Sequence, residues 1–492
     1  MVRQTPLAGA HIRDMSGQLD RAAPHPYNQF QVAIEEAHSA LSNKVAIITL
    51  GCAKNTVDSE HIKRSLLDKG LEVTEQPETA DHIIINTCGF IEAAKQESIN
   101  TIIEAVGMKR HDRPIKVIVT GCLAQRYYKE LSEEIPEIDA LIGIAGEFDI
   151  AGMLADGAFK VTTPDSPVRD FSRYPGRSLS GLPYAYLQIA DGCDNWCAYC
   201  AIPQIRGRFR SKPFETVLNE ARMLDESGVT EIDLIAQDTS RYGADLYGRL
   251  RLPDLLDGLA GFMNIRWVRL LYLQPQNIND DLIEAIKANK LVVPYLDIPF
   301  QHASPAILKA MNRNGSGDAF LEQIARLRRM LPEIALRSSV ILGFPGETDD
   351  DFSMLADFVE KAQLDHLGIF EYSVEEGTAA ADIEAKIPLE LITERYHQLT
   401  ALQDSIGQWR NEQRDGCVFD VLIERQIEPG VYEGRGYWQA PEVDGSIFIS
   451  DKAAPPEINA GRIPLAGDIV KVTIDEFDGC DHHGRLISGP GK

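Results

Sequence analysis

The sequence predicts an α/β chain with two parallel-sheet segments and a small all-β barrel at its C-terminal end. Short apolar strands alternate with helical stretches over residues 42–160 and again over 183–412. Such alternation is typical of βαβ units, whose strands pair in parallel. After residue 413 the pattern changes to short strands separated by Gly, Pro and Asp turns, which is typical of a small barrel.

The first segment, 42–160, is predicted to be a parallel-sheet α/β domain. Its strands and amphipathic helical runs follow each other at roughly 35-residue spacing. The strands are "KVAIITL", "HIIINT" and "KVIVT", and the helical runs are "VDSEHIKRSLLDKG" and "GFIEAAKQESINTIIEAVGMK". The Pro- and Gly-bearing stretch 161–182 is interpreted as a linker with turns.

The central segment, 183–412, carries six strand candidates with helices between them. They are "YAYLQIA", "EIDLIAQ", "RWVRLLYL", "YLDIPF", "RSSVILGF" and "HLGIFEY". This pattern favours a partial (β/α) barrel, with its chemistry in the loops after the strands. A doubly wound open sheet is the alternative. Residues 413–488 are predicted to form the all-β barrel.

Composition and charge narrow the class of protein. The net charge of −25 argues against a general attraction to nucleic acid or to an anionic membrane. It suits a basic protein partner, or it serves solubility alone. No apolar run is long enough to span a membrane, and residues 1–41 lack the apolar core of a secretory signal. We interpret 1–41 as a disordered extension and expect a cytoplasmic protein, in which eight cysteines indicate metal binding or catalysis rather than disulfides.

Three cysteines of the first segment each follow an apolar strand by one to three residues: Cys52, Cys88 and Cys122. Because the carboxyl ends of parallel strands meet at one edge of a sheet, these thiols are predicted to converge there. Three unrelated buried cysteines are the alternative.

A second trio lies in "DGCDNWCAYC", where Cys193, Cys197 and Cys200 follow the first barrel strand. Zinc sites use paired CxxC units some distance apart, and no second pair follows here. A three-cysteine site leaves one metal position open, which is typical of catalysis and leaves the fourth position for a substrate. Cys417 and Cys480 stand alone in the β segment and are interpreted as inert residues.

The spacing CxxxCxxC after a first barrel strand resembles the signature of radical S-adenosylmethionine (SAM) enzymes. The resemblance implies that Cys193, Cys197 and Cys200 hold a [4Fe–4S] cluster whose fourth iron is chelated by SAM, with Tyr199 as the usual aromatic residue before the last cysteine. Six motifs in order resemble the methylthiotransferase branch: "LGCAKNTVDSE", "NTCGFIEAAKQES", "VTGC", "QDTSRYG", "PYLDIPFQHAS" and "FPGET". The terminal barrel then resembles a TRAM domain.

Within that branch, "CAKN", "CGFI", "AQDTS" and "APEVDGSIFI" resemble the enzymes that modify an aspartate of the twelfth small-subunit ribosomal protein. The alternative is a transfer-RNA adenosine methylthiotransferase of the MiaB type. Charge gives a separate test, because residues 417–492 hold 13 acidic and seven basic residues. An RNA-binding barrel needs cations for phosphates, whereas an acidic one suits a basic ribosomal protein. We therefore expect no direct transfer-RNA substrate.

The resemblance also implies a mechanism with two [4Fe–4S] clusters and two SAM molecules. The cluster of Cys193, Cys197 and Cys200 would reduce SAM, and the radical formed would take a hydrogen from the β-carbon of the aspartate. The cluster of Cys52, Cys88 and Cys122 would carry the sulfur that is methylated and transferred. Electrons would come from a donor such as flavodoxin or ferredoxin. The two clusters would have to share one cavity.

Further cofactor contacts are predicted at the same barrel edge. Gln237 and Asp238 end a strand there, and Arg337 is a candidate partner of the SAM carboxylate. Gly343 and Gly346 would let backbone approach the adenosine. The alternatives are a surface ion pair for Arg337 and a tight turn for the glycines. His302 is either a contact residue or a structural histidine.

Some stretches depart from the family pattern. Asn314 in "MNRNGSG" stands where proline is expected, and "YSVEEGTAA" differs from the usual run. The ending "FDGCDHHGRLIS" differs within the domain expected to dock the substrate. The cysteines by themselves also allow two classes of protein other than this enzyme: an electron carrier with two clusters and a zinc-stabilised binding module.

Overall fold

The computed structural model describes most of the chain after residue 43. The described residues are 44–110, 113–157, 168–171, 174, 176–451, 463–479 and 481–488. The extension predicted over 1–41, part of the predicted linker and Cys480 lie outside them.

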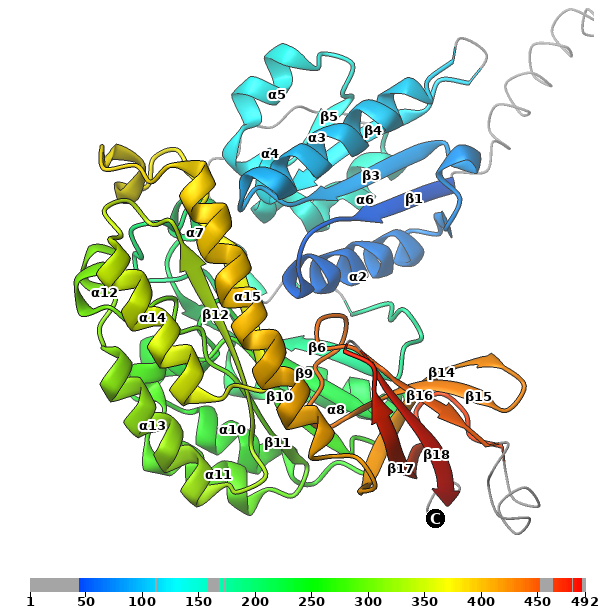
Figure 1. The fold of residues 1–492 in the computed structure, drawn as a ribbon. Coiled ribbons are helices and arrows are strands. Elements are labelled where there is room, and N and C mark those ends of the chain that lie inside the picture. The colour runs from blue at the N-terminus through cyan, green and yellow to red at the C-terminus, as the bar shows by residue number, and fades with distance from the viewer. Residues whose placement is uncertain are drawn as a thin grey trace, which may run out of the picture. The chain divides into compact units, whose positions relative to one another are not determined.

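The first sheet has five parallel strands in the order β2-β1-β3-β4-β5 (Figure 1). This confirms the predicted parallel-sheet α/β fold. The strands are β1 (Lys44–Thr49), β2 (Glu72–Thr74), β3 (His82–Thr87), β4 (Lys116–Gly121) and β5 (Ala140–Leu141). The helices are α2 (Ala53–Asp68), α3 (Glu92–Gly107), α4 (Cys122–Arg126), α5 (Tyr128–Glu134) and α6 (Ile150–Ala155), with 3₁₀ turns η1 (Pro77–Thr79) and η2 (Ile144–Asp149).

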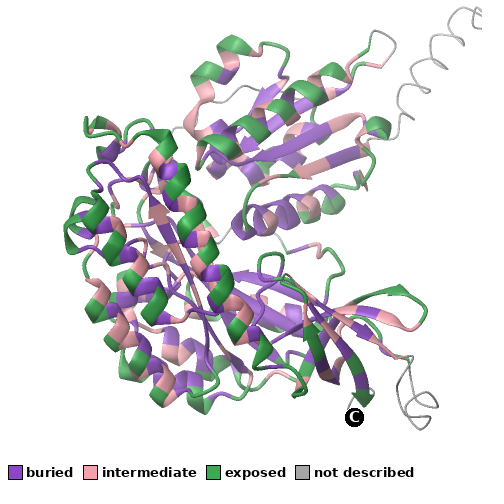
Figure 2. Ribbon diagram, viewed as in Figure 1, coloured by how far each residue is buried: buried purple, intermediate pink, exposed green. Residues whose placement is uncertain are grey.

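The middle strands of this sheet are buried on both faces, as parallel strands covered by helices are. Strand β3 is Ile-rich and β4 is Val-rich, and both are buried along nearly their whole length (Figure 2). After β1 the chain crosses to β2 on one side, whereas β3 lies on the other side of β1. The carboxyl ends of β1 and β3 therefore flank a switch in strand order, where ligands bind in open α/β sheets.

The central sheet has six parallel strands in the order β13-β12-β11-β10-β9-β6. These strands follow chain order without a reversal, which confirms the partial barrel and excludes the doubly wound alternative. They are β6 (Tyr184–Gln188), β9 (Glu231–Ile235), β10 (Trp267–Leu270), β11 (Val292–Asp297), β12 (Ala335–Leu342) and β13 (His366–Glu371). A short antiparallel pair, β7 (Ala190–Asp191) and β8 (Arg210–Ser211), follows β6.

Helices connect the strands of the partial barrel. They are α7 (Ile202–Arg206), α8 (Phe214–Glu226), α9 (Ala244–Tyr247), α10 (Leu252–Leu259), α11 (Asp280–Ala288), α12 (Pro305–Ala310), α13 (Gly317–Met330), α14 (Asp349–Ala362) and α15 (Leu389–Glu412), with 3₁₀ turns η4 (Thr239–Arg241), η5 (Pro275–Asn277) and η6 (Ala379–Asp382). Local sequence fixes several starts: Asn279, Ser304 and Ser316 cap α11, α12 and α13 with their side chains. Thr348 and Asp351 form a capping box at α14.

The C-terminal strands close into a five-stranded barrel in the order β14-β15-β16-β18-β17, which confirms the predicted all-β barrel. They are β14 (Val418–Glu428), β15 (Val431–Gly436), β16 (Ile447–Ser450), β17 (Ile469–Phe477) and β18 (His482–Ser488). All its pairs are antiparallel except β16 with β18.

Alternate residues of the central strands belong to two different cores. Ala185, Leu187 and Leu234 pack against the helices. Tyr186 and Tyr295 instead face a core shared with Trp438 of the small barrel and, in the described residues, with Ala53 and Val57 of α2. The inner face of the partial barrel is thus covered by residues from both other parts of the chain. Among the helices in the described ranges, none combines the length and apolar character that a membrane crossing requires.

Candidate active site

The structure brings the three N-terminal cysteines to one edge of the first sheet. Cys52 caps α2 in an extended conformation, Cys88 directly follows β3, and Cys122 is the first residue of α4. Burial raises the pKa of the Cys88 thiol to about 12, and the charges of Cys122 and Cys52 add to that shift. Each thiol thus acts on its neighbours, which requires that the three lie close together.

Two glycines make this convergence possible. Gly51 has φ +98°, and a Cβ there would lie 2.7 Å from Cβ of Cys88. Gly121 has φ +93°, and a Cβ there would lie 2.5 Å from the carbonyl oxygen of Thr87. Any side chain at these positions would clash with the turn that carries Cys88 and would adopt a backbone conformation that only glycine tolerates well.

Asn55, in the first turn of α2, holds the strand ends together. Its Nδ2 donates to the carbonyl oxygens of Leu50 at 2.7 Å and Thr87 at 3.0 Å. Its Oδ1 accepts from Nη2 of Arg206 at 2.9 Å and lies 4.0 Å from Sγ of Cys122. One buried amide therefore links the carboxyl ends of β1 and β3 with the arginine that ends α7.

The second trio lies in the loop between β7 and α7. The amide of Asn195 donates to Sγ of Cys193 at 3.5 Å, and the amide of Cys200 donates to the carbonyl of Cys197 at 3.0 Å. Burial raises the pKa of the Cys193 thiol to about 11 and raises that of Cys200 as well, in each case with a contribution from Cys197. The three thiols are therefore close enough to act on one another.

The segment that follows α12 holds this loop in place. Nδ2 of Asn312 donates to the carbonyl oxygens of Asn195 at 3.2 Å and Trp196 at 2.9 Å. Nη1 of Arg313 lies 3.9 Å from Sγ of Cys197, while its Nη2 donates to the carbonyl of Pro299 at 2.6 Å. Asn312 thus fixes the loop backbone, and Arg313 places a positive charge beside one of its thiols.

Each cysteine trio has an arginine beside it. Across the described residues, no three His, Cys, Asp or Glu side chains meet the geometry for one metal ion, but Arg206 acts on Cys122 and Cys52, and Arg313 acts on Cys197. Guanidinium groups at this position offset the negative charge of thiolates.

Two buried amides with unpartnered atoms lie at the carboxyl ends of β6 and β9. Gln188 ends β6 and is fully buried, and neither its Oε1 nor its Nε2 has a hydrogen-bond partner among the described residues. Oε1 of Gln237 is also buried and unpartnered, while its Nε2 donates to Asp191 at 3.3 Å. Buried amides of this kind require a polar partner. Their unpartnered atoms are therefore available to form hydrogen bonds with a polar ligand such as SAM.

The other residues that were predicted to contact the cofactor lie in different surroundings. Asp238 accepts from Nδ2 of Asn195 at 3.1 Å and so touches the second loop. Tyr199 packs in an apolar cluster with Ala198 and Phe344. The guanidinium of Arg337 is paired with Asp444 of the C-terminal barrel, so the predicted carboxylate contact would have to compete with that pair.

The motif "FPGET" forms a hydrogen-bonded turn. Gly343 has φ +73° and donates its amide to Oε2 of Glu347 at 2.9 Å. Glu347 is buried, pairs with Arg395 at 2.6 Å, and lies 3.6 Å from Nε2 of His302. His302 is fully buried, and its Nδ1 accepts from the amide of Ser304 at 3.0 Å. These contacts favour the structural interpretation of His302. Gly346 has φ +89° with open space beside it.

A buried ionic network joins the first sheet to the central barrel. Asp58 of α2 pairs with Arg169 and, at 3.0 Å, with Arg206. Arg206 also pairs with Asp191 at 3.2 Å, and Arg169 pairs with Glu147 at 2.5 Å. Asp191 also pairs with Arg210 at 3.7 Å. Burial raises the pKa of Glu147 to about 8, despite the opposing effect of Arg169, and the charges of Asp58 and Asp191 add to that shift.

Sequence reasoning missed Lys54, Asn55, Arg206 and Arg313 as individual site residues. Lys54 is buried, with Nζ 3.2 Å from the centroid of the Tyr272 ring. Burial lowers the pKa of Lys54 to about 8, so the ammonium form still predominates at pH 7. The sequence did offer one signal, which is how near these residues lie to the cysteines. Lys54 and Asn55 lie two and three residues after Cys52, and Arg206 lies six residues after Cys200.

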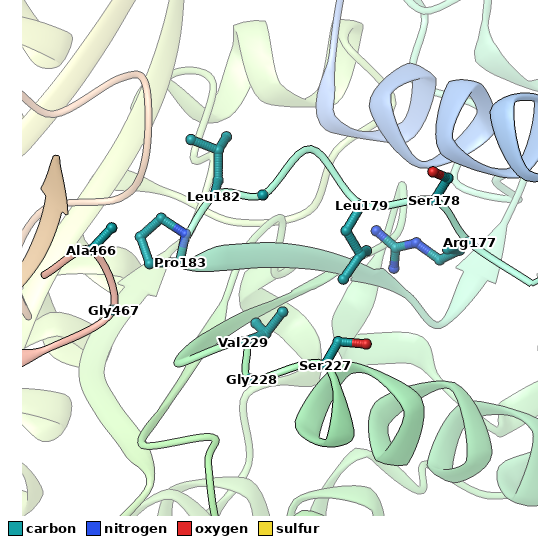
Figure 3. Close-up of a pocket in the computed structure, with 11 residues that line it drawn as sticks. Arg177, Ser178, Leu179, Leu182, Pro183, Ser227, Gly228, Val229, Ala466 and Gly467 are labelled. Atoms are coloured by element: carbon teal, nitrogen blue, oxygen red, sulfur yellow. The ribbon is translucent and has the colours of Figure 1, made fainter. Parts of the chain in front are cut away.

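A pocket of about 430 Å³ lies elsewhere, between the segment before β6, the turn after α8 and the loop before β17 (Figure 3). Arg177, Pro183, Val229 and Gly467 are among its lining residues. The lining includes none of the six cysteines and none of the predicted cofactor contacts. We therefore do not assign this pocket to the active site.

Three family models match the chain in order. They are the uncharacterized protein family UPF0004 over residues 44–143, the radical SAM superfamily over 187–359 and the TRAM domain over 416–487. In fold, the chain is similar to the radical SAM methyltransferase TsrM from Kitasatospora setae with a tryptophan substrate and a SAM analogue bound. That match has a TM-score of 0.53 and 14% identity and covers 74% of this chain and 89% of the other.

Curated relatives match over nearly the whole chain. A ribosomal protein uS12 methylthiotransferase RimO from Acetivibrio thermocellus is 42% identical over 463 residues, covering 92% of this chain and 100% of the relative. Another of the same name from Pelotomaculum thermopropionicum is 45% identical over 412 residues, covering 82% and 93%. These matches confirm the resemblance drawn from the motifs and exclude the electron-carrier and zinc-module alternatives. The chain belongs to the RimO family of radical S-adenosylmethionine methylthiotransferases.

Proposed function

We propose that this enzyme adds a methylthio group to the β-carbon of an aspartate of ribosomal protein uS12. The proposal includes two SAM molecules and two [4Fe–4S] clusters. The observation that carries it is the pair of cysteine trios, each at the carboxyl edge of a parallel sheet and each with an arginine beside it. The curated relatives carry the uS12 name, so the transfer-RNA alternative is not favoured.

In this proposal Cys193, Cys197 and Cys200 hold the cluster that binds SAM, and Cys52, Cys88 and Cys122 hold the other. When bound, these groups supply reductive cleavage of SAM and a sulfur atom, chemistry that no side chain can perform. The chain positions and shields them. Gln188 and Gln237 offer unpartnered amide atoms to SAM, and Tyr199, Arg337 and Gly343 remain predicted contacts.

The partners follow from charge and from the reaction. The acidic C-terminal segment suits a basic ribosomal protein, and no direct transfer-RNA substrate is proposed. A one-electron donor such as flavodoxin or ferredoxin would reduce the cluster. Because the proposed substrate is a ribosomal protein, we propose a cytoplasmic location. We also propose the functional division into 42–160, 183–412 and 413–488, joined by the linker 161–182 and preceded by the extension 1–41.

Anaerobic iron and sulfide counts test the cluster assignment. The wild-type protein should bind about eight irons. The triple alanine variant of Cys193, Cys197 and Cys200 should bind about four, and so should that of Cys52, Cys88 and Cys122. Cys417→Ala is the matched control and should leave the count unchanged. An unchanged count in either triple variant would refute the assignment of that trio.

Mass spectrometry of uS12 tests the activity itself. In a strain that lacks the enzyme, uS12 should lack the mass of one methylthio group, and the wild-type gene should restore it. Both triple variants should fail to restore it, while Cys417→Ala should succeed. Loss of methylthio adenosine from transfer RNA with unchanged uS12 would show that the substrate is wrong.

A further inference from the structure

We infer that Lys54 is the residue that receives the carboxylate of the substrate aspartate. This inference rests on the proposed function, because it takes the substrate to be an aspartate. It assigns substrate recognition to the helix that also carries Cys52, the first residue of the proposed sulfur site.

Lys54 carries an ammonium group that no described residue pairs with directly, although Asp297 and Asp191 lie near enough to act on its charge. The residue is 6% exposed. Its Nζ lies over the ring of Tyr272, 3.2 Å from the ring centroid, and no hydrogen bond or ion pair joins it to an acceptor in the described part of the chain. A buried lysine is almost always paired. A cation held over an aromatic face with no acid bonded to it can receive an anion.

The position of Lys54 is held from both sides. On its own side, Cys52 precedes it by two residues and Asn55 fixes the first turn of α2. On the barrel side, Tyr272 follows β10 with φ +62°, a strained conformation for a tyrosine. Its amide donates to Oδ2 of Asp297 at 3.2 Å, and its carbonyl accepts from the amide of Thr239 at 3.1 Å. The chain thus stabilises a strained turn that places this ring under the ammonium.

Other cations around the two trios are already engaged. Arg206 is bonded to Asn55, Asp58 and Asp191. Arg313 donates to the carbonyl of Pro299 and lies against Cys197. Lys54 is therefore the cation in this described region that is available to a ligand.

The chemistry of the substrate fits this position. The carbon to be modified is directly attached to the carboxylate carbon of the aspartate. A carboxylate entering a site from which water is excluded needs a compensating positive charge. Contact with Lys54 would hold the β-carbon beside the cysteine trio that begins at Cys52 and, through Tyr272, at the carboxyl edge of the central barrel.

Binding measured without turnover tests the inference. Reconstituted, unreduced holoenzyme with SAM is titrated with purified uS12 and with a uS12 variant whose target aspartate is changed to asparagine. Wild-type enzyme should bind the aspartate form about tenfold more tightly, the loss expected for one charge-assisted hydrogen bond. Lys54→Met should bind both forms equally and bind the asparagine form as wild type does. Lys54→Arg should restore part of the preference, and Lys69→Met, at the exposed end of the same helix, should keep all of it.

The outcomes separate the inference from the function on which it rests. If wild type modifies uS12 and Lys54→Met keeps the tenfold preference, this inference is overturned and the proposed function stands. The inference is also overturned, and the proposed function stands, if Lys54→Met weakens the binding of both uS12 forms equally. The same conclusion follows if Lys54→Met weakens only the binding of SAM, measured by equilibrium dialysis. If wild type neither binds nor modifies uS12, both proposals fail.

Discussion

Nη2 of Arg206 donates a hydrogen bond to Oδ1 of Asn55 at 2.9 Å. Asn55 lies three residues after Cys52, and Arg206 lies six residues after Cys200. This single contact therefore connects the first turn of α2, which begins after Cys52, with α7, which begins after Cys200. Because both residues are fully buried, the contact fixes how α2 meets α7, and with it the relation between the two proposed cluster sites.

Replacing Arg206 should destabilise the protein strongly. Arg206→Met would remove the guanidinium that pairs with both Asp58 and Asp191, and would leave them only Arg169 and Arg210. Removing one partner of a buried pair costs about 3–5 kcal/mol, and urea unfolding of the holoenzyme would measure it. Arg208→Met is the control, because the side chain of Arg208 is 80% exposed in its pair with Asp194, and it should change stability little. Equal effects of the two variants would contradict a structural role for the Arg206 network.

Arg313 should raise the reduction potential of the cluster proposed beside it. Its guanidinium lies 3.9 Å from Sγ of Cys197, and a positive charge favours the more negative, reduced state. In a protein that lacks Cys52, Cys88 and Cys122, Arg313→Met should lower the potential by about 60 mV, a tenfold change in a one-electron equilibrium. Potentiometric titration followed by electron paramagnetic resonance would measure it. Arg313→Lys should keep most of the wild-type value, and a loss as large as that of Arg313→Met would argue against a charge effect.

The sequence predicted the elements that carry the cysteines but not the contacts between them. Strands such as "HIIINT" are apolar along their length, so their place in a buried parallel sheet follows from pattern alone. Cysteines directly after such strands could therefore be placed at one edge. The first helix was expected to start at Val57, whereas α2 starts at Ala53, directly after Cys52.

The polar face of α2 shows why the rest could not be predicted. Asp58, Ser59, Glu60 and His61 are buried, whereas an amphipathic pattern assigns such residues to solvent. Their burial depends on partners far away in the sequence, such as Arg169 and Arg206. A charged residue carries no local sign that its counter-ion lies more than a hundred residues away. Lys54 was overlooked because the ring that it contacts, Tyr272, also lies far away in the sequence.

Stability should fall as the pH rises through the neutral range, because of Glu147. Its folded pKa of about 8 lies above the unfolded value of 4.5, so between these values the folded protein binds the extra proton. Stability is then lost as the pH rises toward 8, by about 2 kcal/mol between pH 6 and pH 8 from this group. Glu147→Gln cannot lose that proton and should show a smaller decline in urea unfolding over the same range.

Glu133→Gln, on the exposed face of α5, is the control for this prediction. It should keep the wild-type decline, because Glu133 is exposed and takes no part in the buried network around Glu147. If Glu147→Gln followed the wild-type curve between pH 6 and pH 8, Glu147 would be ionised in the folded protein, and the prediction would be wrong.

Asp444 should control how firmly the C-terminal barrel is attached to the central one. It is buried, pairs with Arg337, and accepts from the Tyr295 hydroxyl at 2.6 Å and from the amide of Ala440 at 2.9 Å. Asp444→Asn leaves the partly buried Arg337 without its ion-pair partner, at a cost of about 3 kcal/mol. Limited proteolysis should then cut faster in the segment that joins α15 to β14, and Arg337→Met, which removes the other charge, should also speed the cut.

Asp420→Asn, which breaks the exposed pair with Lys471, is the control and should leave the cutting rate unchanged. If Asp444→Asn behaves like that control, the other contacts hold the barrel, among them the buried pair of Arg435 with Glu231 and the packing around Trp438, and Arg337 is free for the carboxylate of SAM.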